Sequence, residues 1–272
     1  MKIFDFNIHL PHQVQNATND TISNEVTITA GQLSEVFGQL TGKIKAGSTH
    51  ANIMIFNSMI FESPAILNFT KAFQTEFPGS CLTLLADFRQ AHPEDYLQKA
   101  KLLGVKFIKF HSYVQKIKDC DFETALKMAV IAQNFNMPIC IDASFGTTGM
   151  YTYDNLKLAA AIAERIENVP VVILHSGGAR VFEAMLIAHE KKNVFLETSF
   201  SINYYQGSSI ENDFAFAYKK IGCQKVLFGS DFPYVDNETA KNNTIKYLEK
   251  NKFTAEEIEK ILYHNAMSIL NE

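Results

Sequence analysis

Eight short apolar runs, spread over the whole chain, constrain the fold more than any other feature of the sequence. Each run is apolar almost throughout and does not alternate with polar residues, which is typical of strands buried on both faces of a parallel sheet. After the first gap, the runs begin roughly 25–35 residues apart, which is the length of one strand and helix unit. The runs lie at residues 2–8, 51–57, 81–86, 105–110, 138–141, 171–174, 194–198 and 225–228.

The segments between the runs carry signals for helices. Pro93 suits a first helical turn, and two pairs have the spacing of a capping box, Ser208 with Glu211 and Thr254 with Glu257. A doubly wound open sheet is the competing architecture, but no glycine-rich dinucleotide motif follows the first run. We therefore predict an α/β fold, a (β/α)8 TIM barrel that forms a single domain over residues 1–272.

The first gap is long enough to hold an insertion, which we place at about residues 11–29. Its Gln, Asn and Thr content indicates a loop, with a short strand at 25–29 as an option. A loop that follows the first strand of a barrel lies over the carboxyl-terminal mouth, where lids usually sit.

Charge and apolar length exclude several classes of protein. The chain has 25 basic and 29 acidic side chains, so it lacks the electrostatic footprint of a partner for nucleic acid or an anionic membrane. No stretch approaches the roughly 20 apolar residues of a membrane span, and Asp5 interrupts any signal peptide. We expect a cytoplasmic protein with reduced cysteines and a small-molecule substrate, with a homo-oligomer as an option.

Polar side chains follow the apolar runs at the point where each predicted strand ends. In TIM barrels these ends meet at one mouth, where active sites are assembled. A lone histidine there is as often a satisfied structural group, but several carboxylates and imidazoles on one axis are costly to bury unless they pair or bind a cation. The residues concerned are Asn7, His9, Asn57, Arg89, Lys109, His111, Asp142, His175, Glu197 and Asp231.

Four of these segments together resemble the amidohydrolase superfamily, and most closely its amidohydrolase 2 group of metal-dependent hydrolases and decarboxylases. The segments are Asn-Ile-His at 7–9, Ile-Lys-Phe-His at 108–111, Ile-Leu-His-Ser-Gly-Gly at 173–178 and Leu-Phe-Gly-Ser-Asp-Phe-Pro at 227–233. The closing segment at 261–270 is similar to the last helix of that group, so the resemblance extends over the whole chain.

The resemblance implies one divalent metal ion, usually zinc, bound by a His-x-His pair, a fifth-strand histidine and an eighth-strand aspartate. By position, His9 and Asp231 match metal ligands, and His175 matches the group that polarises the attacking water or substrate. Two positions depart from the pattern: Asn7 replaces the first histidine, and Asp142 replaces the fifth-strand histidine as the third ligand. An amide oxygen is a poor zinc ligand, and the family includes lactonases that work without metal, so both options stay open.

Substrate binding is assigned to Asn7, His111, Arg89 and Arg180. The two arginines follow the third and sixth predicted strands, where a planar guanidinium suits a substrate carboxylate, although a loop-packing ion pair is an equal alternative. Lys109 is assigned a catalytic role; a second anchor for the substrate, a charge partner for a carboxylate and a carbamylated metal bridge are its alternatives.

The resulting hypothesis is a metal-dependent hydrolase that attacks a lactone, amide or ester bond of a small carboxylated compound with an activated water. Asp231 takes the proton of that water, and His175 stabilises the oxyanion that develops. A non-oxidative decarboxylase on the same scaffold is one alternative. A non-catalytic barrel that has lost its metal ligands is the other.

Overall fold

All eight predicted strands are present, and they pair in parallel in sequence order, β1 to β8. The computed structural model describes residues 1–9, 38, 40–42, 44–56, 65–145 and 147–271. The fifth predicted strand ends one residue later than expected, so that Asp142 is its last residue. The strands are β1 Phe4–His9, β2 His50–Ile55, β3 Cys81–Leu85, β4 Val105–Phe110, β5 Ile139–Asp142, β6 Val171–Leu174, β7 Val194–Glu197 and β8 Val226–Leu227.

The segment that follows β8 closes the sheet onto β1. The amide of Phe6 donates to the carbonyl of Phe228 at 2.9 Å, and the amide of His9 donates to the carbonyl of Phe232 at 2.7 Å. In return, the amide of Asp231 donates to the carbonyl of Asn7 at 2.8 Å. The single-domain TIM barrel is therefore confirmed, and the open-sheet alternative is wrong.

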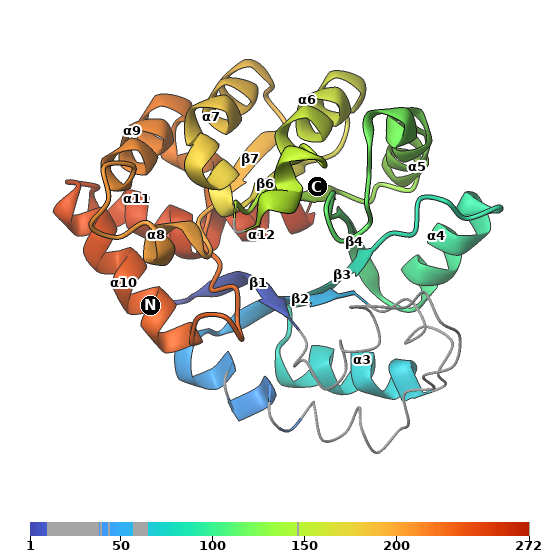
Figure 1. The fold of residues 1–272 in the computed structure, drawn as a ribbon. Coiled ribbons are helices and arrows are strands. Elements are labelled where there is room, and N and C mark those ends of the chain that lie inside the picture. Colours follow the sequence, from blue (N-terminus) through green and yellow to red (C-terminus); the bar gives the residue numbers. More distant parts are fainter. Residues whose placement is uncertain (10–37, 39, 43, 57–64, 146, 272) are drawn as a thin grey trace.

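Helices alternate with the strands and surround the sheet (Figure 1). The amphipathic sequence of most of these segments buries one face of the helix against the outer surface of the barrel, whereas the last helix packs across the amino-terminal end of the barrel. They are α3 Ala65–Glu76, α4 Pro93–Leu102, α5 Phe122–Asn134, α6 Asn155–Arg165, α7 Val181–Glu190, α8 Ser201–Tyr204, α9 Glu211–Ile221, α10 Asn237–Lys250, α11 Ala255–Glu259 and α12 Asn265–Asn271.

One of the two predicted capping boxes is present. Thr254 accepts from the amide of Glu257, and the Glu257 carboxylate accepts from the amide of Thr254. The prediction for Ser208 and Glu211 is wrong, because the Ser208 hydroxyl donates to the carbonyl of Tyr205 and the Glu211 carboxylate accepts from the amide of Gly207. The Glu211 carboxylate therefore accepts from the amide of Gly207, whereas a capping box would need it to accept from the amide of Ser208.

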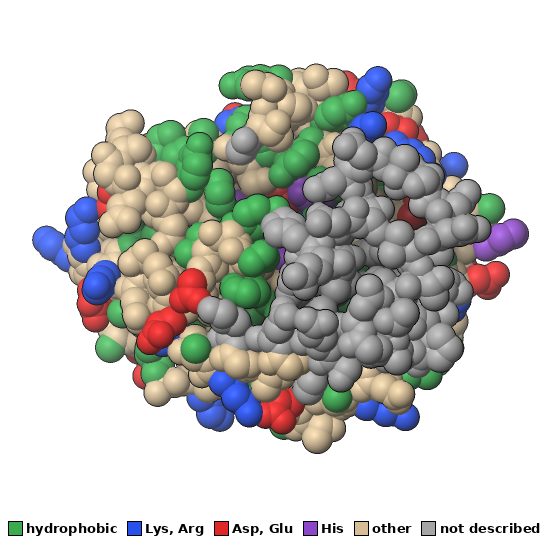
Figure 2. All heavy atoms as spheres, turned by 60° about the horizontal axis from the view of Figure 1, so that its bottom comes forward, with side chains coloured by type: hydrophobic (Ala, Val, Ile, Leu, Met, Phe, Trp, Pro, Cys, Tyr) green, Lys and Arg blue, Asp and Glu red, His purple; other side chains and the backbone are tan. Residues whose placement is uncertain are grey.

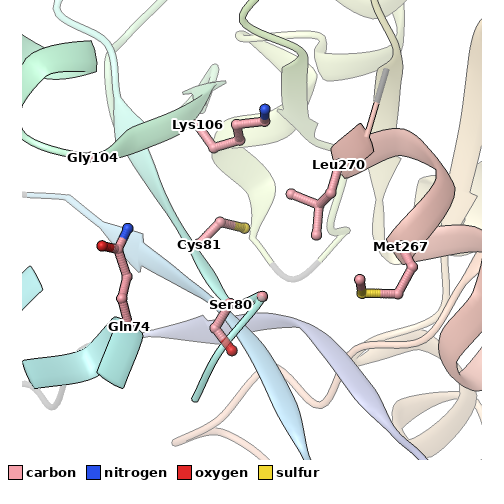
Figure 3. Close-up of a pocket in the computed structure, with 8 residues that line it drawn as sticks. Gln74, Ser80, Cys81, Gly104, Lys106, Met267 and Leu270 are labelled. Carbon is pink, nitrogen blue, oxygen red and sulfur yellow. The ribbon is translucent and has the colours of Figure 1, made fainter. Parts of the chain in front are cut away.

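The inside of the barrel is filled by large side chains at its amino-terminal end. Phe4, Phe6 and Phe107 pack there with Cys140 and other apolar residues, and α12 covers them with Ala266 and Ile269. A small pocket remains between α12 and the starts of β3 and β4, with Cys81, Met267 and Leu270 among the side chains around it (Figure 3). The barrel interior is thus packed with apolar side chains at this end.

Two sequence predictions concern residues whose structure is not described. The insertion at 11–29 lies outside the described residues, as does Asn57 at the end of the second predicted strand. Of the described helices, none combines the length and the apolar character that a membrane crossing requires. All four cysteines are free thiols, as predicted.

Candidate active site

The site lies at the carboxyl ends of the strands and is built by the two-residue period of β-structure. Successive side chains of a strand point to opposite faces, so β4 directs Phe107, Lys109 and the following His111 to the barrel interior. The same alternation places Asp142 above Cys140 on β5. Lys109 is completely buried, and His111 and Asp142 are nearly so.

Asp142 is the centre of a cluster of basic side chains. Its Oδ2 atom lies 2.9 Å from Nζ of Lys109, 3.1 Å from Nε2 of His175 and 3.5 Å from Nε2 of His111. Its Oδ1 atom accepts from the hydroxyl of Ser144 at 2.6 Å. Burial alone would raise the pKa of Asp142, but the ammonium of Lys109 and the imidazolium of His175 hold this pKa well below its usual value. Asp142 is therefore a fixed anion.

The two histidines beside Asp142 differ in charge. Burial lowers the pKa of His111 to about 3, because it outweighs the attraction of Asp142, so this imidazole is neutral at pH 7. Burial also acts to lower the pKa of His175, but the nearby carboxylates of Asp142 and Asp231 raise it to about 9. The cluster therefore contains an imidazolium and a neutral imidazole at the same carboxylate oxygen.

His9 and Asp231 form a second pair at the junction of β1 and the segment after β8. Nε2 of His9 lies 3.1 Å from Oδ1 of Asp231, and both side chains are more than nine-tenths buried. Burial lowers the pKa of His9, although the hydrogen bond with Asp231 raises it. The partner of Asp231 is thus a neutral imidazole, in contrast with the cations around Asp142.

The ring of Phe56 lies between the two groups. Its centroid is 4.8 Å from that of the His9 ring and 5.7 Å from that of His111, both in edge contacts. The Nζ atom of Lys109 lies over the same ring, 4.8 Å from its centroid. Phe56 therefore brings the His9 pair and the Asp142 cluster into one site.

Asn7 joins this site through a serine. Its Nδ2 donates to the hydroxyl of Ser199 at 2.9 Å, and that hydroxyl lies 3.0 Å from Nδ1 of His175. Asn7 is thus linked to His175 through the hydroxyl of Ser199. With this contact, the structure brings together Asn7, His9, Lys109, His111, Asp142, His175 and Asp231.

The two arginines assigned to substrate binding are engaged elsewhere. Arg89 donates to the carbonyl of Gln115 at 3.0 Å and lies 3.3 Å from Asp121. Arg180 lies against the carboxylates of Asp154 and Glu183. These contacts match the loop-packing alternative.

Two backbone features determine where the side chains of Asp231 and His175 lie. Asp231 and His175 have φ values of 64° and 60°, in the left-handed region that residues with a side chain seldom adopt. For Asp231, the neighbouring amide of Ser230 donates to the buried carboxylate of Asp5 at 2.8 Å, and Asn237 donates to the same carboxylate at 2.7 Å. Asp5 thereby ties the first strand to the turn that carries Asp231.

The donors that the described residues offer do not fit the metal site that the family pattern implies. Among these residues, no group of three or more His, Cys, Asp or Glu side chains is arranged to hold a metal ion. Asp142 faces an ammonium and an imidazolium, which repel a divalent cation, and the amide nitrogen of Asn7 is committed to Ser199. Zinc stays a prediction for elemental analysis to test.

Sequence reasoning missed three residues of the site. Ser144 and Ser199 each stand two residues beyond a strand-end carboxylate and hydrogen bond to it, so a carboxylate-x-serine spacing at a strand end is the signal that was available. Phe56 carried no signal, because an aromatic residue at the end of an apolar run cannot be told from a core residue.

Figure 2 shows histidine and hydrophobic side chains at the centre of one face, with most lysine and arginine near its rim.

Comparison with known proteins gives a family and a set of structural neighbours. A family model described as amidohydrolase matches residues 77–271. No curated protein sequence matches the chain.

Similar solved structures cover nearly the whole of both chains. An uncharacterised TIM-barrel protein from Bordetella bronchiseptica has 16% identity and a TM-score of 0.73, with 100% of this chain and 99% of that chain covered. A probable 2-pyrone-4,6-dicarboxylic acid hydrolase from Acinetobacter baumannii, with citric acid bound, has 16% identity, a TM-score of 0.64 and complete coverage of both chains. The 2,6-dihydroxybenzoate decarboxylase from Rhizobium has 13% identity and a TM-score of 0.58, with 100% and 99% covered. At these identities, the likeness shows the fold.

Proposed function

The chain belongs to the amidohydrolase family, and from this premise we propose that it is a hydrolase that cleaves a lactone, ester or amide bond of a small carboxylated compound. The observation that carries the proposal is the contrast between its two carboxylates. Asp142 faces Lys109 and the imidazolium of His175, whereas Asp231 faces an imidazole that burial keeps neutral. Two titratable groups in such different environments are the usual mark of divided acid and base roles.

Asp231 is the proposed general base. Its carboxylate takes a proton from a water molecule while the water oxygen bonds to the carbonyl carbon of the substrate. The tetrahedral intermediate then collapses, the bond from carbon to the leaving oxygen or nitrogen breaks, and the protonated Asp231 returns its proton to the leaving atom. The products are a carboxylic acid and an alcohol, enol or amine, and no other reactant is needed.

Lys109 is the proposed donor to the oxyanion. Its ammonium has three N–H groups, and in the described part of the chain none of them makes a hydrogen bond of good geometry beyond the ion pair with Asp142. The imidazolium of His175 adds a fixed positive charge beside it. Charges held in a water-poor site stabilise a developing anion far more than they would in bulk water.

His111 is the proposed contact for a polar group of the substrate. Its Nδ1 is buried and has no hydrogen-bond partner among the described residues. Because its pKa is lowered to about 3, this ring is neutral and offers one donor and one acceptor. Lys109, His111 and His175 together supply the attraction for a carboxylated compound that sequence reasoning assigned to the two arginines.

Turnover of carboxylated lactones tests the proposal. We would begin with 2-pyrone-4,6-dicarboxylate, because a structural neighbour is named a probable hydrolase of that acid, and follow ring opening by ultraviolet absorbance. Water labelled with ¹⁸O should place one labelled oxygen in the product carboxylate. Purified Asp231→Asn protein is the matched control for a contaminating enzyme.

Two results would overturn the proposal. Release of carbon dioxide from 2,6-dihydroxybenzoate, without hydrolysis of any lactone, ester or amide, would make the decarboxylase alternative correct. Binding of carboxylated compounds, seen as a rise in melting temperature without turnover of any of them, would favour the barrel that has lost catalysis.

A further inference from the structure

The end of β7 carries polar residues that the proposed reaction does not use. Glu197, the last residue of β7, is completely buried, and so are Ser199 and Ser201 just beyond it. Burial raises the pKa of Glu197. We refer to Glu197, Ser199 and Ser201 as the strand-seven clamp, because all three hold the same residue, His175.

The clamp first fixes the backbone of His175. The hydroxyl of Ser201 donates to the carbonyl oxygen of His175 at 2.5 Å, and the amide of His175 donates to Oε2 of Glu197 at 3.2 Å. The next residue, Ser176, donates its hydroxyl to the carbonyl of Glu197 at 2.7 Å. His175 and Ser176 both have positive φ, and such backbone persists only where its surroundings hold it firmly.

The clamp also reaches the imidazole ring, through Ser199. A hydroxyl has one hydrogen to donate and two lone pairs to accept with. Here three polar atoms surround it: Oε2 of Glu197 at 2.7 Å, Nδ2 of Asn7 at 2.9 Å and Nδ1 of His175 at 3.0 Å. Since Asn7 Nδ2 can only donate and a carboxylate can only accept, the hydroxyl gives its hydrogen to Glu197. It is left to accept from Nδ1 of His175.

We propose that Glu197 and Ser199 are positioning residues that hold the His175 ring with a hydrogen on Nδ1, so that Nε2 faces Asp142. This inference rests on the proposed function only for the catalytic use of His175. It also assigns a role to Asn7, because the Asn7 amide donates to the other lone pair of the Ser199 hydroxyl.

Nuclear magnetic resonance of the whole protein, labelled with ¹⁵N in histidine, tests the proposal without any substrate. The ring signals of His175 are assigned by their loss in His175→Gln. In the wild-type protein, we expect a protonated Nδ1 whose hydrogen exchanges slowly with water at pH 7. In Ser199→Ala, that hydrogen loses the hydroxyl at 3.0 Å and keeps only the backbone carbonyl of residue 199, which lies 3.3 Å from Nδ1. Its signal should therefore broaden, because the hydrogen exchanges faster with water.

Ser201→Ala is the matched control, because it removes a hydroxyl from the same clamp that contacts the carbonyl of His175 and not its ring. The Nδ1 hydrogen should survive in Ser201→Ala and in Ser199→Thr, which keeps the hydroxyl. If Ser199→Ala does not fold, Ser199→Cys replaces it, since a thiol is a weak acceptor of similar size.

Two spectra would overturn the proposal. One is a Nδ1 without hydrogen in the wild-type protein, which would mean that Glu197 donates to Ser199 and Ser199 donates to the ring. The other is a Nδ1 hydrogen equally protected in Ser199→Ala. With a substrate in hand, Ser199→Ala should lower kcat roughly 10- to 100-fold, the range for partners that orient a functional histidine, with KM within a few-fold. Absence of any substrate would contradict the proposed function and leave the spectroscopic result standing.

Discussion

The ammonium of Lys109 and the carboxylate of Asp142 are in contact at 2.9 Å inside the barrel, with side-chain exposures of 0% and 3%. Removing two such charges from water costs several kcal/mol for each ion, and their attraction offsets this cost only in good geometry. The contacts of Asp142 with His175 and Ser144 supply that geometry. Asp142 stands at the position where the resemblance to the family predicts a metal-binding histidine.

Lys109→Met tests how strongly the site depends on this pair. The substitution leaves Asp142 buried without its ammonium, so we expect the free energy of unfolding to fall by about 3–5 kcal/mol. Urea denaturation at pH 7 measures the change. Lys260→Met is the control, because it breaks an exposed pair with Glu256 and should leave the midpoint almost unchanged. Equal effects of the two variants would contradict the importance of the buried pair.

Metal analysis decides between the two forms of the hydrolase hypothesis. Because Asp142 is held by cations and Asn7 by Ser199, we expect far less than stoichiometric metal in protein purified without added metal. Activity should survive dialysis against a chelator, and Asn7→His should give no gain. Stoichiometric zinc, lost with activity on chelation and bound more tightly by Asn7→His, would instead confirm the metal that the sequence predicted.

Asp5→Asn should change how stability depends on pH. Burial raises the pKa of Asp5 to about 7, although its hydrogen bonds with Ser230 and Asn237 lower it. The folded protein therefore holds a proton that the unfolded chain has released between about pH 4 and 7, so the contribution of Asp5 to stability is lost as the pH rises through this window. A shift of about three pH units corresponds to on the order of 4 kcal/mol.

Urea denaturation at pH 5 and pH 8 measures this effect as the difference between wild-type and variant proteins. We expect Asp5→Asn to lose less stability than the wild-type protein between the two pH values. The exposed carboxylate of Asp119, which pairs with Lys157, provides the control, and Asp119→Asn should follow the wild-type protein. Parallel behaviour of Asp5→Asn and the wild-type protein would show that Asp5 has an ordinary pKa.

The strands were predictable from the sequence because burial on both faces leaves a continuous apolar run. The polar residues at the strand ends were predictable for a related reason, since a charged residue directly after such a run has few structural explanations. The closure of the barrel was harder to predict from the sequence, because β8 has only two residues. The bridge to Ile8 is made by Phe232, which lies beyond β8. Sequence alone gave no sign of that bridge.

The contacts between side chains were the part that sequence could not supply. Asn7 and Ser199 are 192 residues apart in the chain, and no local pattern links them. Arg89 illustrates the opposite problem: its position beyond a strand predicts an active-site guanidinium, but the neighbouring loop offers it the carbonyl of Gln115 and the carboxylate of Asp121. The guanidinium of Arg89 therefore pairs with groups of the protein itself and not with a substrate carboxylate.

Asp231→Asn is the substitution that separates an enzyme from a binding protein on this barrel. The amide keeps the size of the side chain and can still hydrogen bond to the neutral ring of His9, 3.1 Å away. It lacks the basic oxygen that takes the proton of water, so turnover should fall roughly 100-fold or more. The free energy of unfolding should change by about 1 kcal/mol or less, the usual net worth of one hydrogen bond. Initial rates and urea denaturation on the same preparations measure both quantities. A large loss of stability with turnover within a few-fold of the wild-type protein would mean that Asp231 only holds the turn after β8.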